Sequence, residues 1–217
     1  MKSAMTRNLE QYRKMYQEGR RYGTSSRKLV DEVGSVLDAL MQHHTAESFK
    51  LLDFGCGKSP LVDLLAQRAT QKTPALITQR YDPAIPDYSS PPNGDFDLIV
   101  NTDVLEHLDE DEADMLISDI AERTSAAYFK ISTRTASTIL PNGENAHATV
   151  KGPYWWLSKV QVHFPVAAIM RQDIETVGIF AASNSDAVDN VARGFRAASI
   201  SLKRRIRAYL SGVFRKR

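Results

Sequence analysis

The chain has 217 residues, 42% of them hydrophobic, so it can bury one substantial core and leaves no room for a second domain of normal size. Its single cysteine, Cys56, excludes an internal disulfide and suits a reducing compartment. The formal net charge is +2. No apolar run reaches the roughly 18 residues of a membrane span, so we expect a cytoplasmic protein or one peripheral to the inner face of the membrane.

Two amphipathic helices are predicted at the start of the chain. Residues 5–19 place Leu9, Tyr12 and Tyr16 on one side, and residues 27–42 carry a longer apolar face. Helical spacing of aromatic residues favours core packing, and a cover over a ligand site is the alternative for Tyr12 and Tyr16. The face of the second helix consists of Leu29, Val33, Val36, Leu37 and Leu40.

The most informative stretch is residues 49–67, FKLLDFGCGKSPLVDLLAQ. A strand ending at Asp53 is followed by Gly55 and Gly57, which let the backbone turn sharply and leave space for a ligand. Ser59 can cap the next helix, and Pro60 suits its first turn. The sequence therefore predicts a ligand crevice at the carboxyl end of a strand.

Spacing separates the sites that such a turn can form. A P-loop needs a glycine five residues before Gly57, where Leu52 stands. A dinucleotide fingerprint needs a third glycine where Pro60 stands, which weakens that interpretation. A cationic ligand without phosphate suits the carboxylate of Asp53, and a plain strand-to-helix turn without a ligand is the alternative.

Two further strands are predicted to end in polar side chains. Residues 75–82 close on Asp82, whose carboxylate is placed to accept hydrogen bonds from ribose hydroxyls. Residues 84–94 are rich in turn residues, so the sheet is expected to have one strand fewer than usual, with Ile85 or its neighbours beside an adenine ring. A third strand, residues 97–101, leads into Thr102 and Asp103.

Four segments carry a resemblance to a known family. They read LDFGCGKS (52–59), YDPAIP (81–86), FDLIVNTDVLEH (96–107) and LPNGENAHATVKGPYWW (140–156). Together they resemble the small bacterial or phage-type class I methyltransferases that depend on S-adenosylmethionine (SAM). The likeness spans about residues 49–160 and departs at Ser59, where the family usually has glycine. A helix cap tolerates serine there, whereas a positive φ would strain it.

The resemblance implies an α/β fold with a Rossmann-like, mostly parallel sheet, a terminal antiparallel hairpin and SAM as methyl donor. It also implies the residues that contact the cofactor, which are Asp53, Gly55, Cys56, Gly57, Asp82, Pro83, Thr102 and Asp103. The methyltransferase domain is expected to span residues 1–186, including an N-terminal helical cap over about 1–46.

The loop at residues 134–150 follows a predicted strand, 127–133, and therefore lies where loops surround the ligand crevice. His147 is the candidate catalytic group, because an oxygen nucleophile is poor until a base removes its proton. Asp103 is expected to orient the ammonium group of the donor or to assist that base. Asn145 and His147 are predicted acceptor contacts, and a histidine that only fixes the loop is the alternative.

The acidic run 109–114 is predicted to open a helix that buries Met115, Leu116, Ile117 and Ile120. Trp155 and Trp156 cannot both face inward on a helix, so one is expected to stack on an acceptor while the other packs inside, and packing of both in the core and a lid is the alternative. Residues 166–170 and 176–182 predict the terminal hairpin. His107 and His163 are interpreted as structural, and no metal site is predicted.

The C-terminal segment is basic. Residues 193–217 contain nine of the 28 basic residues and no acid, which leaves the rest of the chain with a net charge of −7. An amphipathic helix over about 187–211 can pack on the body or a subunit, lie on an anionic membrane, or bind nucleic acid, although the negative body does not favour nucleic acid.

The sequence thus predicts SAM-dependent methyl transfer to an oxygen or nitrogen of a small molecule or a cell-surface glycan precursor. The alternatives are a non-catalytic module that binds SAM or a nucleotide, a methyltransferase acting on nucleic acid or protein, and an NAD-linked oxidoreductase. The oligomeric state is left open.

Overall fold

A six-stranded sheet organises the chain in a computed structural model that describes residues 8–18, 29–69 and 74–197. Its strands are β1 (Ser48–Phe54), β2 (Ala75–Tyr81), β3 (Leu98–Thr102), β4 (Ala126–Ser132), β5 (Val166–Gln172) and β6 (Thr176–Ala182). The helices are α1 (Leu9–Gln17), α2 (Val30–Met41), α3 (Leu61–Ala69), α4 (Glu110–Ala121) and α5 (Pro153–His163), with short 3-10 turns η2 (Pro86–Tyr88) and η3 (Leu105–His107).

The strand order is β2-β1-β3-β4-β6-β5. The pairs β1–β2, β1–β3 and β3–β4 are parallel, whereas β6 runs antiparallel to both β4 and β5. The predicted mostly parallel sheet with a terminal hairpin is therefore confirmed. The segment between β2 and β3 contributes only the turn η2, as the turn-rich composition of residues 84–94 indicates.

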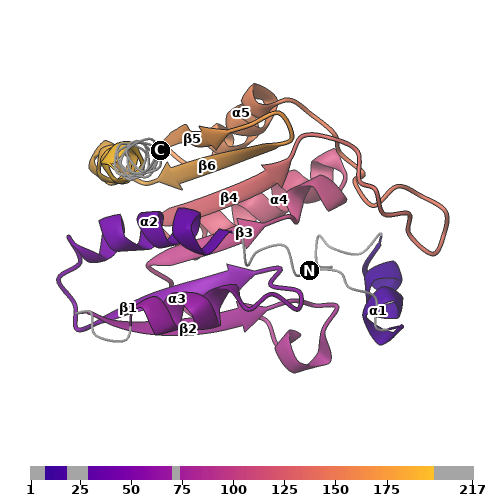
Figure 1. Cartoon of the computed structure of the whole chain (residues 1–217), viewed down its shortest axis with the longest axis horizontal. Helices are drawn as coiled ribbons and strands as arrows, with labels where there is room; N and C mark the ends of the chain where they lie inside the picture. The colour runs from indigo at the N-terminus through magenta and orange to yellow at the C-terminus, as the bar shows by residue number, and fades with distance from the viewer. Residues whose placement is uncertain (1–7, 19–28, 70–73, 198–217) are drawn as a thin grey trace, which may run out of the picture.

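Both faces of the sheet are buried, because successive strand residues point to opposite sides and both sides carry helices. Leu52 belongs to a core cluster with residues of α4 and α5, and its neighbour Leu51 belongs to a second cluster with residues of α2 and α3. Both leucines are fully buried. The result is a three-layer α/β/α arrangement (Figure 1).

Helix α1 lies beyond the carboxyl ends of the parallel strands, apart from the two helical layers (Figure 1). Its buried residue, Met15, packs in a separate small cluster with Leu140 and Ala146 of the loop at 134–150. The helix therefore covers the edge of the sheet at which ligand sites form in folds of this kind.

Two sequence-based details need correction or closer definition. Met115 is 51% exposed, so its predicted burial is wrong. Helix α4 instead buries Ala113, Leu116, Ile117 and Ile120, whose spacing matches a 3.6-residue period better. The predicted serine cap is confirmed, because the hydroxyl oxygen of Ser59 accepts a hydrogen bond from the Leu61 N–H (3.1 Å).

The C-terminal segment begins as a helix at residues 185–197. Val188 and Val191 are buried in the second core cluster, and the ring of Phe195 stacks on Tyr128 with centroids 6.5 Å apart. This part packs on the body of the protein. The predicted basic helix beyond residue 197, and with it the membrane and nucleic-acid alternatives, lies outside the described residues.

Within the described parts of the chain, no helix combines the length and the apolar character that crossing a membrane requires.

Candidate active site

The glycine turn after β1 is held against the end of β2. The N–H groups of Gly55 and Cys56 both donate to the carbonyl of Tyr81, at 2.7 and 3.1 Å. Gly55 and Gly57 have φ values of 81° and 53°, which L-residues with a side chain rarely adopt. A Cβ atom at Gly55 would also lie 2.5 Å from Cγ2 of Val104, so glycine is required there for two separate reasons.

Asp53 lies on β1 just before this turn and is 1% exposed. Neither of its carboxylate oxygens has a hydrogen-bond partner among the described residues. Burial raises the pKa of Asp53 to about 7, Asp82 adds to the rise, and the guanidinium of Arg80 opposes it. A buried carboxyl group in this state is costly unless a cation or a hydrogen-bond donor reaches it.

Asp82, at the end of β2, joins the two loops at the edge of the sheet. One carboxylate oxygen accepts the N–H of Gly57 (2.9 Å), and the other accepts the N–H of Ala84 (2.8 Å). Burial raises the pKa of Asp82, and these two hydrogen bonds oppose the rise. Each carboxylate oxygen has a further lone pair, so the group can still accept hydrogen bonds from a ligand.

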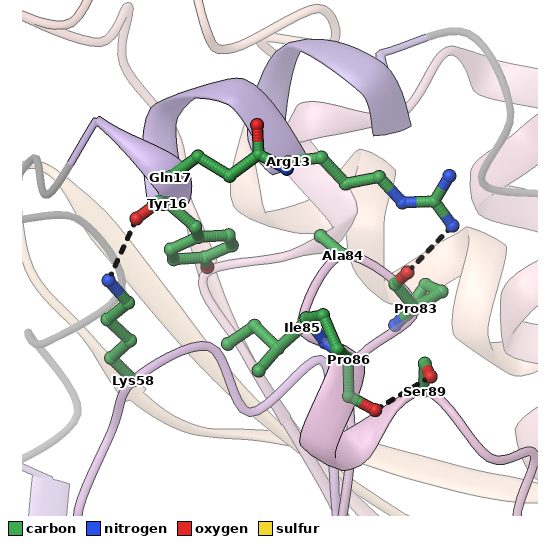
Figure 2. Close-up of a pocket in the computed structure, with 9 residues that line it drawn as sticks. All are labelled: Arg13, Tyr16, Gln17, Lys58, Pro83, Ala84, Ile85, Pro86 and Ser89. Atoms are coloured by element: carbon green, nitrogen blue, oxygen red, sulfur yellow. Dashed lines mark hydrogen bonds between the residues drawn. The ribbon is translucent and has the colours of Figure 1, made fainter.

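A pocket of about 360 Å³ is lined in part by Pro83 and Ala84, which follow Asp82 in the chain (Figure 2). Helix α1 forms one wall, and the segment after β2 forms the opposite wall. One hydrogen bond connects these walls, from Arg13 Nη2 to the Pro83 carbonyl (3.1 Å), and a second, from Lys58 Nζ to the Tyr16 carbonyl (3.2 Å), connects α1 to the turn after β1. The lining residues are Arg13, Tyr16, Gln17, Lys58, Pro83, Ala84, Ile85, Pro86 and Ser89.

Tyr16 places its phenol among the predicted cofactor residues. Burial raises the pKa of Tyr16 and the nearby Asp82 raises it further, so the phenol stays protonated at neutral pH. Burial likewise raises the pKa of the Cys56 thiol, with Asp53 and Asp82 adding to the effect, which removes thiolate chemistry from the glycine turn. Tyr12 packs against the small cluster around Met15, whereas Tyr16 lines the pocket, and a cover over a ligand site stays a prediction.

The end of β3 carries a strained residue. Asp103 has φ = 56° and is the non-glycine residue with positive φ in the part of the chain that the structure describes. Its N–H donates to the carbonyl of Lys130 on β4 (2.9 Å). Strain of this kind persists where the surroundings fix the backbone, and it gathers at functional sites. Thr102, directly before it, is 5% exposed.

Glu106, His107 and His147 meet beside this strained turn. Each offers a nitrogen or carboxylate oxygen, and these atoms all lie within 4.8 Å of one another. The two imidazole rings are 4.9 Å apart, edge to face. The sequence pattern did not indicate this cluster, because residues 107 and 147 approach only in the folded chain, and a structural His107 and the absence of a metal site stay predictions.

Hydrogen bonds to backbone atoms orient all three side chains. The Ser132 N–H donates to Glu106 Oε1 (2.9 Å), while His107 Nδ1 donates to the Ala146 carbonyl (2.8 Å) and His147 Nδ1 to the Arg134 carbonyl (2.6 Å). A carbonyl only accepts, so the Nδ1 atoms carry the hydrogens. In neutral His147 the lone pair is therefore on Nε2.

The same surroundings shift two pKa values in opposite directions. Burial raises the pKa of Glu106 to about 8, and Asp103 adds to the rise. Burial lowers the pKa of His107 to about 4 and His147 adds to the fall, while hydrogen bonds to the backbone of Ala146 and Asp103 oppose it. Both groups are driven toward their neutral forms, as expected for polar side chains in a low-dielectric site.

Asn145 holds the loop that carries His147. Its Nδ2 donates to the Ala136 carbonyl (2.8 Å), and its Oδ1 accepts from the N–H groups of Ala136 (3.1 Å) and His147 (3.0 Å). Asn145 therefore positions His147 through the backbone. A direct contact between Asn145 and an acceptor stays a prediction.

The two tryptophans lie on α5, which packs against α4 and the terminal hairpin. Trp156 is 0% exposed and belongs to the core, as predicted for one of the pair. The ring of Trp155 lies under two ammonium groups, with Lys151 Nζ 5.2 Å and Lys159 Nζ 5.5 Å from its centroid. An acceptor that stacks on Trp155 would have to displace a lysine, and this contact stays a prediction.

No family model matches the sequence, and no curated protein matches it. Solved structures match the fold. An O-methyltransferase family protein from Burkholderia thailandensis shares 17% identity with a TM-score of 0.53, over 74% of this chain and 56% of its own. The magnesium protoporphyrin IX methyltransferase ChlM from Synechocystis PCC 6803, crystallised with SAM, shares 14% identity over 82% of this chain and 92% of its own, with a TM-score of 0.47.

The strand order, the glycine turn after β1 and the likeness to the Burkholderia protein together define the fold. The chain has a Rossmann-like α/β methyltransferase fold with a six-stranded sheet, and it spans about half the length of that structural relative. Identity this low shows the fold alone, and the chemistry follows from the site.

Proposed function

We propose that this protein is a SAM-dependent methyltransferase acting on an oxygen or nitrogen atom of a small molecule. The observation that carries the proposal is the carboxylate of Asp53, buried beside the glycine turn with no hydrogen-bond partner among the described residues. A buried carboxylate needs a positive charge or a donor. The ammonium group of SAM supplies both, whereas a diphosphate would be repelled.

The other predicted cofactor residues fit the same ligand. Asp82 keeps lone pairs that can accept from the ribose hydroxyls, and the two glycines let the ligand approach the backbone. The pocket between Tyr16 and Ile85 offers a flat aromatic side and an apolar side to an adenine ring. Its volume of about 360 Å³ lies within the range of small-ligand sites.

Bound SAM supplies a methyl group on a positively charged sulfur: an electron pair of the acceptor forms the new bond to carbon, the carbon–sulfur pair returns to sulfur, and the acceptor loses its proton. The chain must therefore hold the acceptor in line and manage that proton. Helix α1 packs on the 134–150 loop at the carboxyl edge of the sheet, where the two segments would keep water from a bound ligand. His147, fixed through Nδ1, presents Nε2 as the basic atom for the acceptor.

The acceptor we propose is a small molecule. A glycan precursor is the other acceptor that the sequence predicts, and the paired tryptophans and the basic C-terminal segment are the features that would favour it. Trp156 is buried, Trp155 is covered by lysines, and most of the tail lies outside the described residues, so these features do not add support for a glycan.

Isothermal titration calorimetry tests the cofactor. The full chain is titrated with SAM, its demethylated product SAH, ATP and NAD⁺. We expect saturable heat with SAM and SAH, and at least about tenfold weaker SAM binding in Asp53→Asn, because a charge-assisted contact is lost. Asp119→Asn removes a half-exposed carboxylate on α4 and serves as the matched control.

Binding of ATP or NAD⁺ without SAM would overturn the proposal in favour of a nucleotide module or an oxidoreductase. If SAM binds, isotope-labelled SAM is then incubated with panels of small alcohols, phenols and amines. Label that enters only protein or RNA would refute the small-molecule acceptor.

A further inference from the structure

The cluster of Glu106, His107 and His147 has a property that methyl transfer as proposed does not use. Glu106 is 0% exposed, and its Oε2 atom has no hydrogen-bond partner among the described residues. An orphaned buried oxygen of this kind calls for a ligand or an ion. Two imidazoles stand beside it, so that all three ligand atoms fall within 4.8 Å of one another.

The supporting contacts are those of a metal site. Histidines that bind metals usually donate their other ring N–H to a carbonyl or carboxylate, which fixes the tautomer and the ring orientation. His107 and His147 both donate Nδ1–H to backbone carbonyls, at 2.8 and 2.6 Å. The remaining oxygen of Glu106, Oε1, is held by the Ser132 N–H.

Helix α1 adds a further support. The hydroxyl of Tyr12 donates to the Ala146 carbonyl (3.2 Å), the same atom that accepts from His107. The ring of Tyr12 also packs edge to face on His107, with centroids 5.6 Å apart. Helix α1, the 134–150 loop and the turn after β3 therefore all contact this group of side chains and hold it in place.

We propose that Glu106, His107 and His147 bind one divalent transition-metal ion of the Zn²⁺ type. Two imidazole nitrogens and one carboxylate oxygen form a donor set that suits Zn²⁺ and related ions, and three protein ligands leave a coordination position open. Around tetrahedral Zn²⁺, ligand atoms stand about 3.4 Å apart. Small rotations of the side chains must therefore draw the three atoms together on binding.

A role for the ion rests on the proposed function. Its open position would hold the acceptor oxygen, which restricts the acceptor to an alcohol or phenol. The ion would lower the pKa of that hydroxyl, the proton would pass to solvent, and the resulting oxygen anion would take the methyl group. In this arrangement His147 acts as a ligand and not as the base, because its Nε2 lone pair is bound to the ion and the proton of the acceptor goes to solvent.

Cobalt titration tests the site. The full chain is treated with a chelator, dialysed and titrated with Co²⁺ near neutral pH while the visible absorption is recorded. We expect one equivalent to bind, with bands typical of low coordination number, and Zn²⁺ to displace it. His147→Ala should weaken Co²⁺ binding by more than about tenfold, because loss of even an outer-shell partner costs 10- to 100-fold.

His163→Ala is the matched control, since His163 lies 3.3 Å from Asp114 on the α4–α5 face. Glu106→Gln repeats the test at a second ligand. His147 is only half-buried, so the His147 variant keeps the test valid if the Glu106 variant fails to fold. Absence of saturable Co²⁺ binding, or equal affinity in wild type and His147→Ala, overturns the metal proposal.

SAM binding measured on the same metal-free protein separates the two proposals. Calorimetric SAM binding without Co²⁺ binding overturns the metal site alone. Co²⁺ binding without SAM binding overturns the methyltransferase and leaves a metal-binding protein.

Discussion

Replacement of Gly55 by alanine probes the glycine turn most directly. The change adds one carbon to a residue with φ = 81°, and that carbon would lie 2.5 Å from Cγ2 of Val104. The left-handed backbone costs an alanine about 1–2 kcal/mol. Val104 is buried and branched at Cβ, so its methyl cannot swing away freely, and overpacking adds about 1–3 kcal/mol.

We therefore expect Gly55→Ala to lower the free energy of unfolding by about 2–5 kcal/mol, measured by urea denaturation. Gly143→Ala separates the two contributions, because Gly143 has φ = 87° and nothing within 4 Å of the added carbon. It should cost only about 1–2 kcal/mol. Gly152→Ala, which has neither positive φ nor a close neighbour, should cost about 1 kcal/mol or less, because Gly152 is the N-cap of α5 and alanine caps a helix less well than glycine.

A double-mutant cycle with Val104→Ala measures the contact itself. Removal of the valine methyls should return about 1–2 kcal/mol to the Gly55→Ala protein, since residues in contact couple by that amount. SAM affinity should fall in Gly55→Ala and stay unchanged in Gly143→Ala. Equal destabilisation by Gly55→Ala and Gly143→Ala would refute the argument from close approach.

Three further outcomes are expected. SAM affinity should rise as the pH increases through about 7, because the buried Asp53 must lose its proton to bind a cation. The rise should vanish in Asp53→Asn. Calorimetry over a pH series checks this, and the same dependence of SAM affinity on pH in the variant and the wild type contradicts it. Glu32→Gln should destabilise the fold by about 3–5 kcal/mol, because it leaves the buried ammonium of Lys130 without its counter-charge 3.2 Å away. Arg171→Ala removes the half-exposed partner of the same carboxylate and should lower the free energy of unfolding by less than Glu32→Gln, measured by urea denaturation. A larger loss in Arg171→Ala would show that the buried Glu32–Lys130 pair is not the main stabilising contact. His147→Ala should lower the rate of methyl transfer by about 10²-fold or more with SAM binding retained, and a normal rate would remove His147 from the chemistry.

The candidate site divides into parts that local sequence reveals and parts that it does not. Asp53 lies near the end of β1, and Gly55, Gly57 and Asp82 follow strand ends, so a pattern of apolar runs and turn residues was enough to place them. His147 stood out as a titratable group in a loop at the same edge. The partners of His147 did not stand out, because Glu106 and His107 belong to a short turn with no metal-ligand spacing.

The tryptophan pair shows the same limit from the other side. Adjacent positions on a helix point in different directions, which fixed that only one ring could be buried. The packing of α5 against its neighbours decides which ring is buried. It also decides that Lys151 and Lys159 lie over the other ring. The predicted burial of Met115 was wrong because the apolar character of the residue was taken as evidence of burial. The buried face of α4 consists of Ala113, Leu116, Ile117 and Ile120, and Met115 lies outside it.

The sequence by itself determined the order of strands and helices, the glycine turn, the helix cap at Ser59 and the carboxylates at two strand ends. These follow from hydrophobic period, backbone freedom and capping, which act over a few residues. Tertiary structure alone decided that α1 closes over the crevice and that Glu106, His107 and His147 converge. Those contacts join segments some 40 to 130 residues apart, such as Tyr12 with Ala146, and only the closing of loops over the sheet edge brings them within reach of a hydrogen bond.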